Sequence, residues 1–399
     1  MQTVWLMTCA GWLLLIYLAV GGIYWLLNAW AAVRLTGSVR RLEHLCPPAP
    51  TIWPKVSLII PACNEADTLE AATRSRLGED YPNFEVVLIN DRSTDATGQI
   101  VDRIAASDPR VKPLHITELP AGWLGKVHAL QKGTEIARGD WLLFTDADVH
   151  FKPGTIRRTV AWAEQRGLDH VAALPAIESA GFWLDVVLAG FLRLFFLGIR
   201  SWAVENPRSS AHIGVGAFNL VRRAALERTE GFAWLRLEVG DDVALGKLLK
   251  QSGARSALIN ASRHLRVRWY GSIREMAIGS ERGAYTVLSR FSFARAVLVG
   301  TTLLGLEMSP FLALLAFEWP TMQLAGAVTS GLALATAVYL VRWARGPVLP
   351  ALLLPVASVI LAFFVFRAGY LGWRRGGILW RGTLYRTEVL RTGTRVRFP

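Results

Sequence analysis

Cysteine and acidic residues are both scarce in this chain of 399 residues. The three cysteines, Cys9, Cys46 and Cys63, show no spacing typical of a metal site or a disulfide framework. A chain without disulfides suits a reducing cytosol. A Gly-x-Gly-x-x-Gly motif is missing where an apolar run ends at Pro61, which disfavours a dinucleotide-binding Rossmann site.

Charged residues of either sign are also few. They make up 19% of the chain, whereas hydrophobic residues make up 52% and the mean hydropathy is +0.31. A soluble protein needs more polar surface than this. The apolar residues concentrate toward both ends, which predicts a soluble domain held between membrane segments.

The N-terminal apolar run extends from about Trp5 to Val33 without a charge. It exceeds the ~20 residues needed to cross a bilayer. A signal peptide is disfavoured because the apolar core is too long and no basic segment precedes it. Arg34, Arg40 and Arg41 follow, so the positive-inside rule predicts a retained anchor with the next segment in the cytosol.

Basic residues outnumber acidic ones, and the formal net charge is +13. The arginines cluster beside apolar segments, as Arg374 and Arg375 do, which favours anionic lipid headgroups as their partner. No basic groove with interleaved aromatic residues is evident, so we expect no nucleic-acid binding.

Three further apolar segments, about Ala296–Phe317, Thr321–Val341 and Val348–Phe366, precede the C-terminus. If all three cross the membrane, the arginine-rich tail lies outside, against the positive-inside rule. We therefore expect one proline-bearing segment to be re-entrant or interfacial. The tail residues in question are Arg374, Arg375, Arg381, Arg386, Arg391, Arg395 and Arg397, against a single Glu388.

A shorter apolar stretch, Phe182–Trp202, lies within the middle of the chain. Asp185, Arg193 and Arg200 interrupt it and disfavour a membrane span. An amphipathic helix in the membrane interface and an ordinary buried helix remain equally open.

The middle of the chain alternates short apolar runs with helical stretches. Runs of this length suit buried parallel strands with crossover helices, and such sheets bind ligands at the carboxyl ends of their strands. The predicted strands are 56–60, 84–90, 141–145 and 171–174, and the predicted helices are 65–76, 94–107, 125–137 and 154–166.

Carboxylates follow three of these strands, and Asp146 with Asp148 is the sharpest pair. Two carboxylates two residues apart can converge through a turn on a hard cation such as Mg²⁺ or Mn²⁺, which prefers oxygen ligands and leaves positions open for phosphate. Asp-x-Asp is common by chance, but its place directly after a buried strand favours a metal site.

Two other polar positions open helices. Lys126 is preceded by Gly125 and can meet a phosphate by charge and backbone N–H groups, although a solvated lysine in a turn is the simpler alternative. Asp241 and Asp242 begin an apolar helical run. We expect one of them to be the N-cap and the other to face a cleft as a base with a raised pKa. The alternative is that both merely favour a helix N-terminus.

Together these positions resemble the family 2 inverting glycosyltransferases with a GT-A fold. The resemblance covers about 54–290 and implies an α/β fold with a Rossmann-like mixed sheet flanked by transmembrane helices. Residues 119–126 look closest to the hopene-associated (hopanoid-biosynthesis) and carotenoid-type membrane enzymes. The matching motifs are Val56 to Glu65, Asn90 to Asp95, Lys126, Asp146-Ala147-Asp148 and Asp241-Asp242.

The resemblance implies a role for each motif. Asp91 would hydrogen-bond the base, commonly uracil, Lys126 would approach the diphosphate, and Asp242 would be the general base. Asp148 would bind the metal, with Asp146 also touching ribose or sugar. The nucleotide pocket would include Pro61 and Glu65, and the candidates for the acceptor or the diphosphate are Asp241, Gly214, Gly216 and Phe218.

One family motif is missing. Polymer-making and ceramide-type relatives carry Gln/Arg-x-x-Arg-Trp after the base, and this chain has only the partial match Arg266, Arg268 and Trp269, followed by Arg274 and Arg282. One of these arginines would hold the leaving diphosphate. The departure argues against a processive polymer synthase.

The sequence thus predicts a multi-pass protein of the inner (plasma) membrane. Its expected activity is inverting, metal-dependent transfer of a sugar, with UDP as the expected nucleotide, to a lipid hydroxyl at the cytosolic face. Alternatives are transfer to polyprenyl phosphate or to a growing polysaccharide, and a degenerate non-enzymatic scaffold. The expected parts are an anchor (1–35), a catalytic domain (36–290, core 54–260, interfacial helix 182–202), C-terminal membrane helices (291–371) and a basic tail (372–399).

Overall fold

The computed structural model describes residues 2–380 and 382–396. Arg381 and Arg397 of the basic tail therefore lie outside the described residues. The chain forms two compact units. The sheet unit comprises Ser38–Glu178, Ile199–Trp269 and Arg381–Pro399, and the helical unit comprises Met1–Gly37, Ser179–Gly198 and Tyr270–Trp380.

These units divide the chain differently from the expected parts. Two segments that the sequence places with the catalytic domain, 182–198 and 270–290, group with the helical unit. The tail residues 382–396 group instead with the sheet unit.

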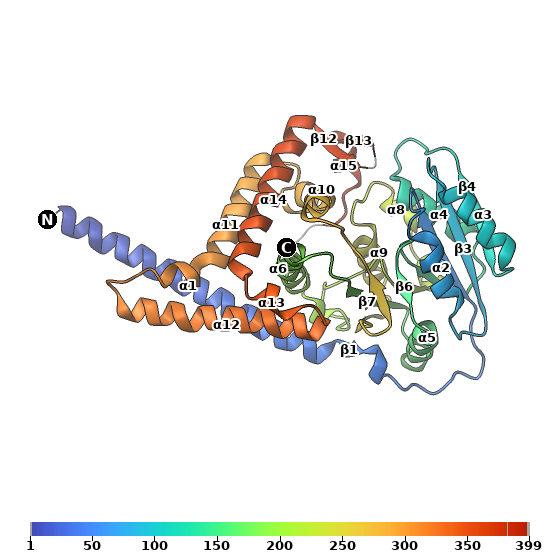
Figure 1. The fold of residues 1–399 in the computed structure, drawn as a ribbon, viewed down its shortest axis with the longest axis horizontal. Coiled ribbons are helices and arrows are strands. Elements are labelled where there is room, and N and C mark those ends of the chain that lie inside the picture. The colour runs from blue at the N-terminus through green and yellow to red at the C-terminus, as the bar shows by residue number, and fades with distance from the viewer. Residues whose placement is uncertain (1, 381, 397–399) are drawn as a thin grey trace. The chain divides into compact units, whose positions relative to one another are not determined.

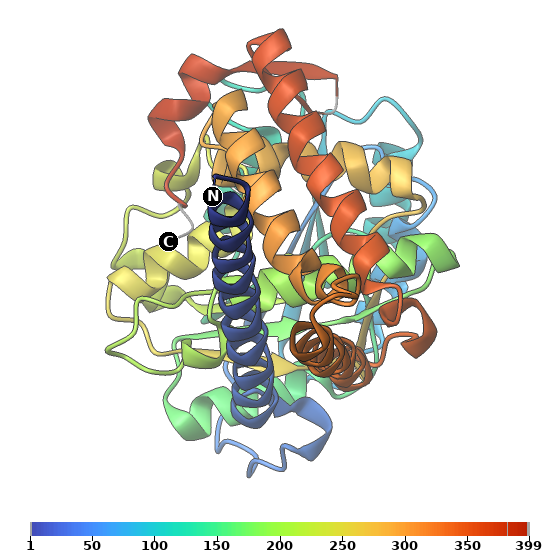
Figure 2. The same cartoon turned by 90° about the vertical axis from the view of Figure 1, so that its left-hand side faces the viewer.

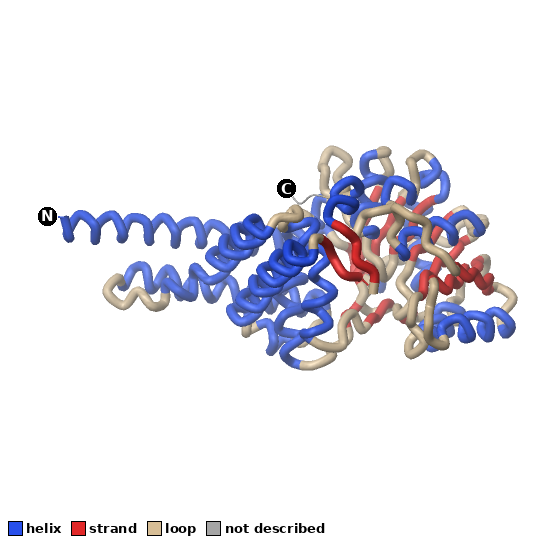
Figure 3. The backbone as a smooth tube through the Cα atoms, turned by 90° about the horizontal axis from the view of Figure 1, so that it is seen from above, coloured by secondary structure: helices blue, strands red, loops and turns tan. Residues whose placement is uncertain are grey.

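An eight-stranded sheet forms the centre of the sheet unit (Figures 1 and 3). Its strand order is β1-β10-β7-β9-β5-β2-β3-β4. All four predicted strands are confirmed, as β2 Val56–Ala62, β3 Phe84–Asp91, β5 Trp141–Phe144 and β7 His170–Leu174. The other four are β1 Arg40–Arg41, β4 Val111–Ile116, β9 Asn219–Arg222 and β10 Ser256–Asn260.

The sheet is mixed, as the resemblance implies, because of a single strand. β9 runs antiparallel to both of its neighbours, β5 and β7, whereas the other neighbouring strands pair in parallel. The four predicted strands run parallel to one another, as expected, and β9 is an additional strand that the apolar runs did not predict. Between β7 and β9 the chain leaves this sheet to form α6 in the helical unit.

Helices cover the sheet and bury its apolar side chains. Helix α4 packs on β2 and β3, and α3 packs on β3 and β4 (Figure 1). All but one residue of β3 are buried, as expected of a strand covered on both faces. The helices here are α2 Leu69–Leu77, α3 Thr97–Ser107, α4 Gly125–Ile136, α5 Thr155–Arg166, α7 Arg223–Glu227, α8 Phe232–Leu235, α9 Asp241–Gln251 and α15 Thr387–Gly393.

Shorter elements complete the sheet unit. They are the 3₁₀ turns η1 Leu42–His44 and η2 Ser201–Ala203, the strand β13 Thr383–Arg386, and a small sheet of β6 His150–Phe151, β11 Leu265–Val267 and β8 Ala176–Ile177.

Helix α2 begins four residues later than predicted because residues 63–68 form a turn. Asn64 adopts a left-handed conformation with φ of 57°. Side chains of the loop after β3 take up the N–H groups of this turn. Ser93 Oγ accepts from Asn64, and Asp95 Oδ2 accepts from Ala66. The loops after β2 and β3 are therefore tied together at the sheet edge.

The helical unit consists of long apolar helices, of which α1 is the longest (Figure 2). Five helices in the described residues are long and apolar enough to cross a membrane, and α6 is among them. The unit contains α1 Gln2–Ser38, α6 Phe182–Gly198, α10 Ile273–Gly283, the π-helical turn η3 Ala284–Leu288, α11 Phe293–Ala313, α12 Pro320–Ala344, α13 Val348–Ala351, α14 Leu354–Arg375 and β12 Gly377–Trp380.

A buried polar cluster joins four of these helices. Arg193 of α6 pairs with Glu307 of α11 and donates a 2.7 Å hydrogen bond to Asn28 of α1. Tyr24 of α1 and Ser358 of α14 both donate to the Glu307 carboxylate. The Arg193 charge that argues against membrane burial of α6 is thus neutralised inside the unit.

Candidate functional site

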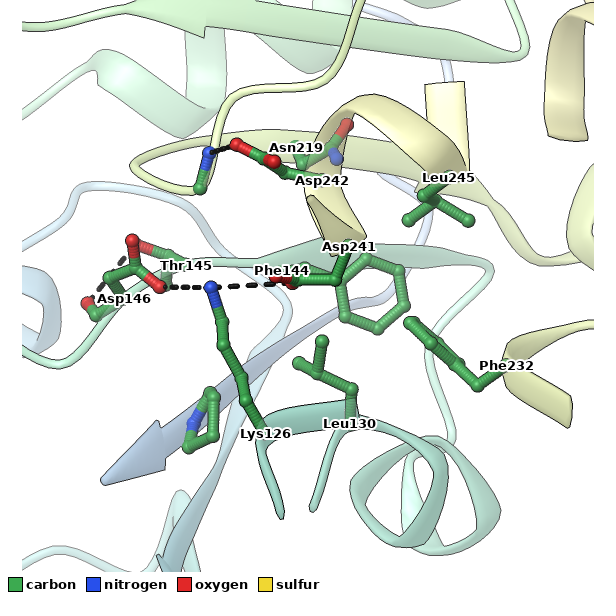
Figure 4. A pocket seen from close by; sticks show the side chains of 12 residues that line it. Lys126, Leu130, Phe144, Thr145, Asp146, Asn219, Phe232, Asp241, Asp242 and Leu245 are labelled. Atoms are coloured by element: carbon green, nitrogen blue, oxygen red, sulfur yellow. Dashed lines mark hydrogen bonds and ion pairs between the residues drawn. The ribbon is translucent and has the colours of Figure 1, made fainter. Parts of the chain in front are cut away.

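Strands β5, β2 and β3 are neighbours, so the residues that follow them meet at one edge of the sheet. A pocket at this edge encloses about 280 Å³, part of it open to solvent (Figure 4). Its floor combines apolar and charged side chains. The lining residues are Pro61, Lys126, Leu130, Phe144, Thr145, Asp146, Gly216, Asn219, Phe232, Asp241, Asp242 and Leu245.

Lys126 lies at the centre of the charged groups in this pocket (Figure 4). Its Nζ is 2.7 Å from Asp146 Oδ1 and 3.3 Å from Asp241 Oδ2. Burial lowers the pKa of Lys126, but the carboxylates of Asp146 and Asp241 outweigh burial, and the net shift is upward. The lysine is therefore a fixed positive charge held by two carboxylates from distant parts of the chain.

Asp242 faces the pocket from the first turn of α9. Its Oδ2 accepts a 2.9 Å hydrogen bond from the Gly216 N–H, and its Oδ1 accepts one of 2.8 Å from the Val243 N–H. Burial and the nearby Asp241 carboxylate raise the pKa of Asp242 to about 6. The expectation that one of the two aspartates is the N-cap is wrong, because Gly240 occupies that position.

Two glycines allow these carboxylates to approach. A Cβ on Gly214 would lie 1.8 Å from the Asp242 carbonyl oxygen, and a Cβ on Gly216 would lie 2.5 Å from Asp146 Oδ2. The Gly216 carbonyl also accepts the Asp146 N–H at 2.9 Å. This loop thus contacts both acidic segments at once, and a side chain at either glycine would separate them.

Asp148 lies beside the pocket among other acidic groups. Burial, followed by the charges of Asp146 and Glu65, raises its pKa to about 6. Among the described residues, no three His, Cys, Asp or Glu side chains form a metal-binding group. A pair of crowded carboxylates nevertheless suits a divalent cation whose other ligands are phosphate oxygens and water.

Arg76 of α2 lies under the turn that carries these carboxylates. It is fully buried, and its guanidinium donates to the backbone carbonyls of Asp146 and Ala147. It also lies 5.6 Å over the Phe151 ring. A buried positive charge therefore supports the acidic turn from within the domain.

Asp91 ends β3 and is buried. Arg92, with φ of 54°, turns back to bind both carboxylate oxygens at 2.7 and 3.0 Å. The pair packs against the start of α4, where a Cβ on Gly125 would lie 2.2 Å from Arg92 Nη2. Asp91 is not among the residues that line the pocket of Figure 4.

The sequence profile described as Glycosyl transferase family 2 matches residues 57–229, which carry most of this site. Residues 57–229 thus match the family 2 glycosyltransferases, and the region is called the glycosyltransferase domain below. The prophage bactoprenol glucosyl transferase homolog of Escherichia coli K12 is 38% identical over 177 residues, which is 43% of this chain and 54% of that protein. Succinoglycan biosynthesis protein ExoO of Rhizobium meliloti is 34% identical over 123 residues, 30% of this chain and 33% of that protein.

This chain spans at most about half the length of these curated relatives. The similarity to one solved structure covers most of the chain. The mannosyltransferase PcManGT of Pyrobaculum calidifontis, in complex with GDP-Man and Mn²⁺, superposes with a TM-score of 0.56 at 22% identity, covering 90% of this chain and 98% of that one. The glycosyltransferase domain therefore has the predicted mixed GT-A fold.

Several predicted residues are not among those that line the pocket. Phe218 is fully buried in the core beside Phe151, so its side chain does not face an acceptor. Arg266, Arg268 and Trp269 are exposed at or after β11, and Arg266 lies 3.5 Å from Glu178. Arg282 belongs to the helical unit, where it lies 4.4 Å over the Trp380 ring.

Arg76 supports the turn that carries Asp146 and Asp148, although no sequence motif indicates this role. The only signal in the sequence is its position on the apolar face of α2, in register with Leu69, Ala72 and Thr73. An arginine at such a position must find polar partners in the interior, because a buried charge without them is costly.

Proposed function

We propose that this protein transfers a sugar, with inversion, from a nucleotide sugar to a lipid hydroxyl at the cytosolic face of the inner membrane. The observation that carries the proposal is the meeting of Lys126, Asp146, Asp241 and Asp242, from three separate segments, in one pocket of a family 2 domain. A single displacement at the anomeric carbon inverts its configuration.

Asp242 is the proposed general base. As the acceptor oxygen bonds to the anomeric carbon, the bond from that carbon to the diphosphate oxygen breaks on the opposite face, and Asp242 takes the hydroxyl proton. Each carboxylate oxygen has two acceptor positions. The backbone N–H groups of Gly216 and Val243 use one on each oxygen, so capacity for the proton remains.

Lys126 and the acidic turn would serve the diphosphate. Lys126 has its positive charge at the base of the pocket, where a phosphate could exchange for one of its carboxylate partners. Asp146 and Asp148 would hold Mg²⁺ or Mn²⁺, which when bound neutralises charge on the leaving group. Arg76 fixes the backbone of this turn from below. Pro61 lines the pocket and Glu65 lies close to Asp148, which suits them to the nucleotide side.

A lipid acceptor is supported by the helical unit, whose five long apolar helices suit a bilayer. A hopanoid hydroxyl is the specific acceptor that the 119–126 segment favours. Transfer to a polyprenyl phosphate is the second candidate, favoured by the name of the bactoprenol glucosyl transferase homolog from Escherichia coli. A phosphate acceptor is already ionised at neutral pH and does not need a strong base.

The test uses the full chain in detergent with nucleotide sugars and candidate lipids. We expect Asp242→Asn to lower transfer to a hydroxyl by ~10²–10⁴-fold while the nucleotide still binds. Asp67→Asn is the matched control, because Asp67 is exposed and outside the pocket. Full transfer by Asp242→Asn to a lipid hydroxyl would refute the base assignment, whereas retained transfer to polyprenyl phosphate alone would select the second acceptor. Absence of transfer and of donor hydrolysis in the unaltered protein would point to a scaffold.

A further inference from the structure

The basic tail folds back on the sheet unit. Residues 382–396, called the strap below, comprise β13, α15 and the segment that follows them. Leu390 and Val396 of the strap are buried, although most of its other side chains are exposed. Burial of these two apolar side chains indicates that the strap is docked, since a detached basic tail would leave both exposed.

The C-terminal end of the strap is anchored to the loop that leads into α9. Glu238, buried in this loop, accepts hydrogen bonds from the backbone N–H groups of Arg395 and Val396, the latter at 3.0 Å. The same carboxylate accepts the Gly240 N–H at 3.3 Å. Lys247 of α9 donates to the Arg395 carbonyl. One buried carboxylate thus binds both the strap and the residue directly before Asp241 and Asp242.

The other end of the strap reaches the residues that follow β3. The hydroxyl of Tyr385 in β13 accepts a hydrogen bond from the Gly125 N–H. It also interacts electrostatically with the charged side chains of Arg92 and Asp91. The loop before Gly125 is also bonded to the segment just before Glu238, because the Leu124 N–H donates to the Arg236 carbonyl at 2.7 Å. The strap therefore spans from the Asp91 side of the site to the Asp242 side.

We propose that the strap completes the donor site, with Tyr385 contacting the nucleotide beside Asp91 and the Glu238 anchor holding the loop that positions Asp242. The inference rests on the proposed function, because it assumes that a nucleotide binds next to Asp91. A phenol suits this position, since its ring offers a flat apolar face to a base and its hydroxyl offers a hydrogen bond. Burial raises the pKa of Tyr385, which keeps that hydroxyl protonated.

The experiment measures binding of UDP, GDP, CDP and dTDP to the full chain in detergent by titration calorimetry. We expect Tyr385→Ala to weaken binding about tenfold, the loss of one aromatic hydrogen-bonding contact, and Tyr385→Phe to fall between it and the unaltered protein. Leu384→Ala is the matched control, because Leu384 is the neighbouring residue of the same strand and is exposed.

A second variant releases the strap instead of altering its contact residue. Leu390→Asp places a charge on a buried anchor, so trypsin should cut the strap faster and nucleotide binding should weaken as in Tyr385→Ala. Combining the two substitutions should weaken binding no further, because both remove the same contact.

The outcomes separate the inference from the proposed function. If the unaltered protein binds none of the four nucleotides, the proposed function fails. If it binds one of them and Tyr385→Ala binds it equally well, the strap inference alone is overturned. Tighter binding or faster turnover in Tyr385→Ala would overturn it too, because the strap would then obstruct the site.

Discussion

Asp242 shows how position alone can raise the pKa of a carboxylate. Two backbone N–H groups stabilise its ionised form, yet burial and the Asp241 carboxylate raise its pKa to about 6. The other charged groups that act on it are Lys126, at the start of α4, and Asp146, after β5. Lys126 opposes the shift, and the two carboxylates favour it.

This shift predicts how stability depends on pH. Because the folded-state pKa lies above the unfolded value, ionisation of Asp242 costs stability as pH rises from about 4 through about 6. We expect Asp242→Asn to raise the free energy of unfolding at pH 7 by roughly 1–3 kcal/mol, and the gain to vanish near pH 4. Urea unfolding at both pH values measures it, with Asp67→Asn as the control that shows no such difference. A gain that persists unchanged at pH 4 would contradict the assignment.

At the scale of single elements, the buried cluster of the helical unit explains why apolar helices tolerate charge. Arg193 and Glu307 are both almost fully buried, and each has a further hydrogen-bonding partner on another helix. Arg193 also lies 4.8 Å over the Trp25 ring. The cluster specifies which faces of α1, α6, α11 and α14 meet.

Removing one partner of this cluster should be costly. We expect Glu307→Ala to lower the stability of the helical unit by ~3–5 kcal/mol, because it leaves a buried guanidinium unpaired. Glu307→Gln should cost less, because its carboxamide oxygen still accepts hydrogen bonds. Thermal unfolding in detergent measures both. Glu318→Ala, in the exposed connection between α11 and α12, is the control. Equal stabilities for Glu307→Ala and Glu318→Ala would show that the cluster contributes nothing.

Elements with continuous apolar runs were predictable from the sequence, and those shaped by tertiary contacts were not. β2, β3, β5 and β7 read as buried strands because nearly every residue in them is apolar. β4 was missed because, at the sheet edge, only its end residues Val111 and Ile116 are buried and it includes the polar Lys112 and His115.

The same distinction holds at the site. The aspartates and Lys126 follow strands or open helices, so their clustering follows from sheet topology. Arg76 and Tyr385 reach the site from a helix face and from the far end of the chain, and no local pattern reports such contacts. Phe218 was misplaced because a position in a polar loop says nothing of the direction in which the side chain points.

For the whole molecule, the sheet constrains how the chain can pass through a membrane. Residues 38–178 and 199–269 supply strands to one sheet, so in a membrane-spanning chain both would lie on the same side of the bilayer. Helix α6 connects them and therefore cannot cross as a single span. The strap belongs to the same unit, so an even number of crossings must separate Trp269 from Gly382. Three candidate spans, α11, α12 and α14, lie between these residues, so we expect at least one of them not to cross.

Cysteine labelling in intact cells can test the topology expected from the shared sheet. With the native cysteines replaced, we expect probes at the exposed positions 208 and 388 to react only after the inner membrane is permeabilised. A cysteine at position 318, between α11 and α12, should react from outside if α11 crosses. Labelling of position 388 from outside while position 208 stays protected would contradict the shared sheet unit.

The strap follows every residue of the pocket in the chain, so it is synthesised after all of them. If the donor site is finished only when residues 382–396 dock, a growing polypeptide exposes its aspartates and lysine long before it can use them. Chains cut before residue 382, by a premature stop or by a protease, would then lack a finished donor site. An intact strap would thus be a condition for turnover.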